Sequence, residues 1–239
     1  MKILVDTHTH TNCSTHAFGT VWENLTMAKR HGMEMVCMTN HGPNMPDAPH
    51  IWHFETMYEL PEEIDGVRLL KGAEANVLDT EGNLDIPLGL QKDMDMMIAS
   101  IHRYCYTKKT PTEHTKTWLK VIENPYVTIL GHTGHPDYAF DHEAVVEAAK
   151  KHKKCIEINN HSFYVRKGSI ENCRKIAECC KKIGTGIVVS SDAHTPFQVG
   201  VFDKALELLK EVDFPEALIM NLTAERFEHY LKECRAGRN

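Results

Sequence analysis

The residues of this chain with the clearest capacity for chemistry are its histidines, which number 16 among 239 residues. Two short motifs combine histidine with a second potential ligand, His8-x-His10 near the start and Asp192-x-His194 near the end. Residues two apart in an extended segment place their side chains on the same side. Imidazole and carboxylate are typical ligands of Zn²⁺, Mn²⁺ and Fe²⁺. The two motifs therefore indicate a site for divalent metals.

Five further candidate ligands stand at or just beyond the ends of apolar segments: His16, His41, Glu74, His102 and His132. A single histidine in such a place is more often an ordinary polar residue than a ligand. Here six of seven predicted strands end in this way, and independent coincidence is a poor explanation. If the strand ends meet at one edge of the fold, these seven imidazoles and two carboxylates predict a site for several metal ions.

The elements that must position these residues alternate between strand and helix, which is typical of parallel βα units. The predicted strands are Lys2–Asp6, Met35–Met38, Val67–Ala73, Met96–Ile101, Thr128–Leu130, Cys155–Ile158 and Gly186–Ser190. The predicted helices are Val21–His31, Thr112–Glu123, His142–His152, Ser169–Ile183, Val201–Glu211 and Ala224–Cys234. Most strands are continuous apolar runs, as expected when both faces are buried. A long loop with a short helix is expected over Gly42–Ile64.

Seven such units predict an α/β fold with one closed or nearly closed parallel barrel formed as a single domain by residues 1–239. The carboxyl ends of barrel strands share one face, and active sites lie there. The nine candidate ligands should therefore converge. Five histidines on predicted helices or their ends are instead expected at the surface: His31, His114, His142, His152 and His229.

Composition narrows the function classes. The net charge of −6 argues against broad binding to nucleic acid, which needs basic surface. Apolar runs are far shorter than the roughly 18 residues of a membrane span. The first residues do not resemble a signal peptide, and the eight cysteines form no Cys-x-x-Cys pair. We therefore expect reduced thiols and a cytoplasmic protein. The oligomeric state, including a homo-oligomer, stays open.

The chain resembles the polymerase-and-histidinol-phosphatase (PHP) family of metallophosphoesterases over essentially its whole length. The resemblance rests on Asp6-Thr7-His8-Thr9-His10, Thr39-Asn40-His41-Gly42, Gly72-Ala73-Glu74, Ile101-His102, Gly131-His132 and Ser191-Asp192-Ala193-His194. Within the family, the chain is most similar to the stand-alone YcdX-type phosphatases. This closer likeness rests on residues 47–54 and on Glu157-Ile158-Asn159-Asn160-His161-Ser162-Phe163 followed by Arg166-Lys167-Gly168-Ser169. The resemblance implies a distorted (β/α)7 barrel with three divalent metal ions, with zinc first and manganese or iron as alternatives.

The resemblance also implies which residues hold each metal. His8, His10 and Asp192 would hold one ion, and His102 and His132 a second. Glu74 would bridge these two ions. The third ion would be held by His16, His41 and His194. Glu74 and Asp192 are thereby expected to be essential for catalysis.

Arg166 is expected to be a catalytic phosphate clamp, with Asn160, His161 and His135 as further substrate-binding residues. An ordinary surface arginine is the alternative for Arg166. The sequence departs from the family pattern at Asn40, Thr133, His135 and His161. The first of these changes concerns the orientation of the neighbouring His41. The others concern substrate preference.

The function expected is hydrolysis of small phosphomonoesters by a metal-bound hydroxide. Three ions, two carboxylates and a hydroxide would leave a local charge of about +3, which attracts a phosphate dianion. The alternatives are a histidinol-phosphate phosphatase specifically, a nuclease or phosphodiesterase acting on DNA ends, and an amidohydrolase-like deacylase. A metal-storage protein without activity is a further alternative. A small phosphorylated substrate is the expected partner, and neither a membrane nor, in general, nucleic acid is.

Overall fold

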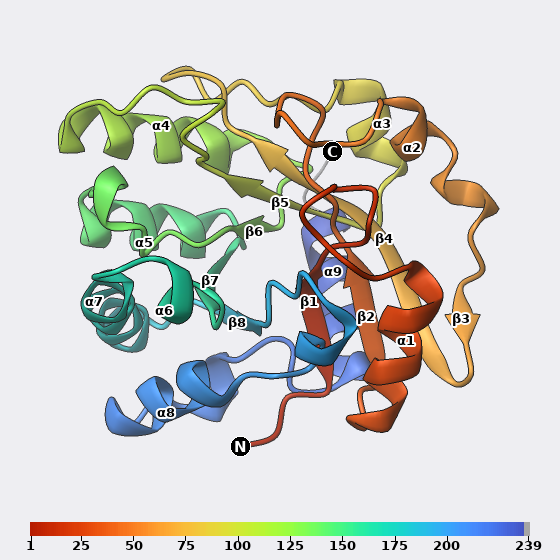
Figure 1. The fold of residues 1–239 in the computed structure, drawn as a ribbon. Coiled ribbons are helices and arrows are strands. Elements are labelled where there is room, and N and C mark those ends of the chain that lie inside the picture. The colour runs from red at the N-terminus through yellow and green to blue at the C-terminus, as the bar shows by residue number, and fades with distance from the viewer. Residues whose placement is uncertain (237–239) are drawn as a thin grey trace.

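Seven parallel strands form a nearly closed barrel in the computed structural model, which describes residues 1–236 (Figure 1). The predicted α/β fold with a (β/α)7 barrel is confirmed. Neighbouring strands follow the order β1-β2-β4-β5-β6-β7-β8. Their bounds are Val5–Thr9 (β1), Met35–Met38 (β2), Val67–Asn76 (β4), Met96–Ser100 (β5), Ile129–Leu130 (β6), Cys155–Asn159 (β7) and Ile187–Ser190 (β8). The short β3, Glu63–Ile64, pairs antiparallel with β4 and was not predicted from the sequence.

Helices cover the outside of the barrel, with α4, α5, α7 and α8 in a column on one side and α1 on the other (Figure 1). Their bounds are Val21–Arg30 (α1), Trp52–Glu55 (α2), Leu88–Asp93 (α3), Pro111–Glu123 (α4), His142–Lys151 (α5), Ser162–Val165 (α6), Ser169–Ile183 (α7), Asp203–Glu211 (α8) and Ala224–Ala236 (α9). Four single 3₁₀ turns are Met57–Glu59 (η1), Pro136–Tyr138 (η2), Pro196–Gln198 (η3) and Glu216–Leu218 (η4). None of the helices within residues 1–236 has the length and apolar character needed to cross a bilayer.

The helix ends follow from local chemistry. Thr20 and Glu23 form a reciprocal capping box at the start of α1, and Thr110 and Glu113 do the same at α4. These contacts satisfy backbone N–H groups that have no partner inside the helix. At the other end of α7, Gly184 takes a left-handed conformation with φ of 80°, which a residue without Cβ adopts at little cost.

The last helix closes the end of the barrel opposite the candidate site. Phe227, Tyr230 and Leu231 of α9 join a cluster with the inward-facing apolar residues of the strands. These are Val5, Met35, Cys37, Leu70, Met96, Ile98, Ile129, Cys155 and Val188. Figure 1 shows α9 behind β1 and β2. The barrel interior below the candidate site is therefore a packed core.

The seam between β1 and β8 is closed largely by side chains. The two strands meet at one bridge, Thr9 with Ala193. Below it, the buried amide of Asn221 donates to the carbonyls of Val5 and Val189 at 2.8 and 2.6 Å and accepts from the Val189 N–H at 3.0 Å. Asn221 thus replaces missing backbone hydrogen bonds, and the seam brings the first and last candidate ligands together.

Two strands extend further toward the site than their apolar residues indicate. The first strand was predicted over Lys2–Asp6 but spans Val5–Thr9, and the third predicted strand continues from Ala73 to Asn76. In both, backbone pairing continues through polar residues that are buried because they face the site. His8 and Glu74 therefore lie within strands, where their backbones are held by the sheet.

Candidate metal centre

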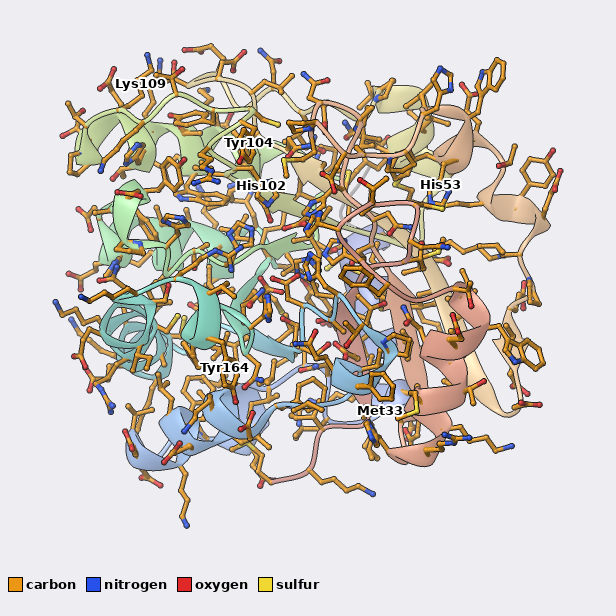
Figure 2. The ribbon with its side chains drawn as sticks, viewed as in Figure 1. Met33, His53, His102, Tyr104, Lys109 and Tyr164 are labelled. Atoms are coloured by element: carbon orange, nitrogen blue, oxygen red, sulfur yellow. The ribbon has the colours of Figure 1, made fainter. Side chains whose placement is uncertain are left out.

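The nine predicted ligands converge at the carboxyl ends of the strands, with the buried carboxylate of Glu74 at their centre. Its Oε1 lies 3.0 Å from Nε2 of His132 and 3.3 Å from Nε2 of His102. Its Oε2 lies 2.8 Å from Nδ1 of His41, 3.3 Å from Nε2 of His8 and 3.6 Å from Nε2 of His10. The two oxygens thus face different histidines, as a bridging ligand requires. His102 is labelled in Figure 2, at the end of β5.

Asp192 is the second buried carboxylate of the cluster. Its Oδ1 lies 3.1 Å from Nε2 of His10, 3.5 Å from Nε2 of His8 and 3.7 Å from Nδ1 of His194. Asp192 has a φ of 52° and His132 a φ of 27°, in the left-handed region that non-glycine residues rarely adopt. Backbone strain of this kind concentrates at functional sites.

Four histidines are oriented by an acceptor at Nδ1, which leaves Nε2 to face the cluster. His8 donates to Glu157 at 2.7 Å, and His102 donates to Asn76 at 2.6 Å. The Nδ1 atom of His194 lies 2.9 Å from the carbonyl of Asp192, and that of His16 is bound by Asp47. Histidine ligands of metals are typically held in this way by their other ring nitrogen.

Several buried polar atoms of the cluster have no hydrogen-bond partner within residues 1–236. They are His8 Nε2, His10 Nδ1, His41 Nδ1 and Glu74 Oε2. The last two atoms lie close to each other but do not form a hydrogen bond. A buried polar atom left in this state costs free energy unless another group satisfies it. Since nitrogen and carboxylate oxygen are the ligands that zinc, manganese and iron accept, the donor set fits divalent metals.

Three trios of residues each offer donor atoms within 4.8 Å of one another: His8, His10 and Glu74; His41, Glu74 and His102; and His10, His41 and His194. The trios share members, so one compact cluster serves several positions. Asp192 and His132 belong to none of them, and neither does His16. Its ring centroid lies 4.4 Å from that of His194 and 5.3 Å from that of His41.

His16 is the exposed member of the cluster, with a side chain 49% accessible. Asp47, from the loop after β2, binds both its ring and, at 3.2 Å, its backbone N–H. Sequence reasoning assigned Asp47 no role. The sequence offers only one sign of this role, a carboxylate in the long Pro-rich loop, and that sign alone does not identify a functional residue.

Glu157 is a buried residue of the site that sequence reasoning also left without a role. It lies in β7 between Ile156 and Ile158, accepts from His8, and accepts from the backbone N–H of His132. A glutamate inside an otherwise apolar strand was the available signal, because buried carboxylates are rare unless they are paired. Glu157 and Asp47 add negative charge that the expected local charge of the site did not include.

Burial decides the protonation of several imidazoles. It lowers the pKa of His132 to about 4, with the Arg166 cation acting in the same direction, and it lowers the pKa of His194 to about 4. Burial also acts on His8, but the charges of Asp192, Glu74 and Glu157 outweigh it and raise the pKa of His8. His132 and His194 are thus neutral near pH 7, which is the form that binds a metal.

A cavity of about 350 Å³ opens over the cluster. It is lined by His16, His41, Met45, Glu74, His102, His161, Val165, Arg166, Asp192 and His194. A larger hollow of about 510 Å³ lies between β4, α2 and α3, and none of its lining residues is a histidine. The histidine-lined cavity is therefore the one that joins open space to the candidate ligands.

The four predicted substrate-binding residues are placed differently. The guanidinium of Arg166 lines the cavity, donates to Ser162 Oγ at 2.7 Å, and has Nη1 3.8 Å from Oδ2 of Asp192. His161 lines the cavity as well. The amide of Asn160 is engaged by Asp203 and by the Ala205 N–H of α8.

His135 is outside the lining of the cavity, and its Nδ1 accepts from the Asp137 N–H at 3.2 Å. Thr133, another departure from the family pattern, is buried. Asn40 accepts from the Thr11 N–H at 2.7 Å and its Nδ2 lies 3.1 Å from Nε2 of His53. Asn40 thus fixes the loop after β1.

One of the histidines expected at the surface is buried. His114 of α4 is 1% accessible, accepts from the Lys109 N–H at 3.0 Å and has Nδ1 2.9 Å from the Ala139 carbonyl. The expectation was wrong because α4 packs this face against the loop after β6. Both ring nitrogens are occupied, so His114 is structural.

Comparison with known proteins gives concordant results. A relative from Acetivibrio thermocellus, named a probable phosphatase, is 48% identical over 232 residues, covering 97% of this chain and 96% of its own. A second probable phosphatase, from Thermoanaerobacter sp., is 48% identical over 235 residues, covering 98% and 96%.

Among solved structures, histidinol phosphate phosphatase from Lactococcus lactis, complexed with zinc, L-histidinol and phosphate, has a TM-score of 0.65 at 19% identity. It covers 93% of this chain and 98% of its own, and shows a shared fold. The PHP domain family model matches residues 6–171, which run from within β1 to the first turn of α7. The chain therefore belongs to the PHP domain family.

Proposed function

We propose that this protein is a metal-dependent phosphatase that hydrolyses small phosphomonoesters at the histidine cluster. The observation that carries the proposal is Glu74, a buried carboxylate whose two oxygens lie within 3.6 Å of five histidine nitrogens. Relatives named probable phosphatases, nearly equal to this chain in length, support the activity class.

In this proposal the nine residues hold three divalent metals. His8, His10 and Asp192 hold one, and His102 and His132 a second, with Glu74 shared between them. His16, His41 and His194 hold the third. Zinc is favoured, and the zinc in the Lactococcus lactis structure supports that choice. Such metals supply Lewis-acid stabilisation of phosphoryl oxygens and lower the pKa of a water molecule.

The residues of the chain then divide the remaining work. Three imidazoles are held in orientation at their Nδ1 atoms: that of His8 by Glu157, that of His102 by Asn76 and that of His16 by Asp47. Arg166 faces the cavity beside Asp192, where a guanidinium can bind two phosphoryl oxygens in a planar fork. Glu157 and Asp47 make the site less positive than the nine ligands alone imply, and Arg166 restores part of that charge.

The decisive experiment is a screen of the metal-loaded protein over a panel of phosphorylated metabolites, with elemental analysis of the same preparation. We expect phosphate release from monoesters, including p-nitrophenyl phosphate, and little activity on phosphodiesters or amides. Phosphate release from histidinol phosphate alone would favour the specific histidinol-phosphate phosphatase. Cleavage at DNA ends would favour the nuclease. If the loaded protein cleaves no phosphoester, the proposal is wrong.

A further inference from the structure

A second hollow adjoins the candidate metal cavity on the side of α6. Its volume is about 200 Å³, and it is lined by Asn160, His161, Tyr164, Ser191, Gln198 and Val201. Ser191 lines this hollow, and the next residue, Asp192, lines the metal cavity. In the same way, Tyr164 lines the hollow and Val165 lines the metal cavity. Figure 2 shows Tyr164 between α6 and α8. The two spaces are therefore neighbours.

His161 belongs to the lining of both spaces. It immediately precedes α6, and its ring stacks on that of His194 with centroids 5.4 Å apart and planes 23° apart. Its imidazole therefore forms a wall between the metal cavity and the second hollow. A phosphate held over the cluster would lie beside this wall.

The lining of the second hollow is uncharged and able to form hydrogen bonds. Tyr164 donates its hydroxyl to Asp203 at 2.7 Å, which leaves the phenol oxygen able to accept. Gln198 accepts from the His194 N–H at 3.3 Å through Oε1, which leaves its NH₂ group able to donate. Val201 supplies an apolar side. Hydroxyl groups suit such a surface.

The size of the hollow limits what it can hold. Binding sites for drug-sized ligands have volumes of roughly 300–1,000 Å³, so 200 Å³ suits a fragment of a few heavy atoms. A nucleoside or another bulky group would extend past it into solvent.

We propose that this hollow is a subsite for the alcohol portion of the substrate and that it favours small, uncharged alcohols with several hydroxyl groups. His161 and Val201 set its size, and Tyr164 and Gln198 recognise the hydroxyl groups. The inference rests on the proposed phosphatase function and names the substrate class for it.

The experiment compares kcat/KM for glycerol 2-phosphate with kcat/KM for a nucleoside 5′-monophosphate, using the metal-loaded protein. We expect the wild type to prefer glycerol 2-phosphate. Val201→Phe fills the hollow and should lower kcat/KM for glycerol 2-phosphate by about tenfold or more. Inhibition by inorganic phosphate should stay unchanged, because phosphate occupies the neighbouring cavity. His161→Ala joins the two spaces and should raise the relative kcat/KM for the nucleotide.

Tyr164→Phe is a second variant that needs no room for a larger side chain, because it only removes the hydroxyl of a residue that is 58% exposed. It should lower kcat/KM for glycerol 2-phosphate, roughly fivefold to tenfold for one hydrogen bond, and lower it less for p-nitrophenyl phosphate, whose leaving group carries no further hydroxyl. The exposed His152, directly after α5, is the matched control for His161 when replaced by alanine.

The outcomes separate the two proposals. If the wild type hydrolyses phosphomonoesters but Val201→Phe and Tyr164→Phe keep its substrate ratios, the subsite is wrong and the phosphatase stands. A wild-type preference for the nucleotide also overturns the subsite. If the wild type releases no phosphate from any ester, the phosphatase proposal fails and the subsite fails with it.

Discussion

The Nδ1 atom of His8 lies 2.7 Å from Oε1 of Glu157, and both side chains are fully buried. The same carboxylate accepts from the backbone N–H of His132, the residue with the unusual φ of 27°. One strand, β7, thus orients two proposed ligands that arise 124 positions apart in the chain and belong to different proposed metal positions. We infer that Glu157 is a positioning residue for these two histidines.

We predict that Glu157→Gln lowers metal affinity and kcat/KM by roughly ten- to a hundredfold, the usual effect of losing a group that orients a ligand. The change keeps the shape of the side chain but removes the charge that stabilises the imidazole of His8. Metal titration of the apoprotein measures the effect. Glu143→Gln, at an exposed ion pair with Lys182, is the control. Equal affinity in the two variants would show that Glu157 is merely structural.

Glu74→Gln should abolish phosphatase activity while the chain stays folded. The substitution is nearly isosteric, but it removes the charge that faces five histidine nitrogens, and an amide cannot bridge two cations in the same way. Asp192→Asn should act similarly. Activity measured beside circular dichroism and metal content checks both. Turnover near that of the wild type in either variant would remove that residue from the ligand set.

Metal content should approach three divalent ions per chain, and removing the metals should destabilise the fold. Without metal, three imidazole nitrogens and one Glu74 oxygen stay buried without a partner within residues 1–236, whereas a bound ion adds about 2.7 kcal/mol of stability per site at a hundredfold excess over its Kd. Elemental analysis and thermal unfolding, with and without a chelator, test this. At most one ion per chain under saturating conditions would falsify the three-metal proposal.

The sequence predicted which residues meet at the cluster better than which groups orient them. The His-x-His and Asp-x-His motifs can be recognised in the sequence, and their meeting can be predicted because strand ends in a parallel barrel lie at one rim. Glu157 and Asp47 carry no such spacing, and their roles depend on tertiary contacts between β7 and β1 and between two loops. Likewise, α3 and α6 were not predicted, because helices of six and four residues show little periodicity.

Asn221 offers a test of how the barrel closes. Asn221→Leu leaves the carbonyls of Val5 and Val189 and one N–H without their partner at a buried seam. We expect a loss of about 3 kcal/mol in the free energy of unfolding, which corresponds to a fall in Tm of about 6–12 °C for a chain of this size. Calorimetry of the metal-free protein avoids a contribution from ligand loss. An unchanged Tm, matching that of the exposed control Asn12→Ala, would contradict the role of this seam.

Arg166 distinguishes a phosphate clamp from a surface arginine. Its side chain is 18% accessible, it lines the cavity over the cluster, and Ser162 fixes Nη1 at 2.7 Å, which leaves the other guanidinium nitrogens for a ligand. Arg166→Ala should leave metal content unchanged. It should weaken inhibition by inorganic phosphate and lower kcat/KM by roughly ten- to a hundredfold, as expected for a charged hydrogen bond worth about 1.5–3 kcal/mol.

Arg166→Lys should recover part of that loss, because lysine restores the charge but cannot bind two oxygens in a plane. The neighbouring Lys167, which is exposed, gives the control Lys167→Ala with wild-type kinetics. The comparison also separates the clamp from an effect on Asp192, whose Oδ2 lies 3.8 Å from Nη1: a disturbed ligand would reduce metal content along with activity. Kinetics and phosphate inhibition of Arg166→Ala that match those of Lys167→Ala would leave the cavity without its cationic clamp.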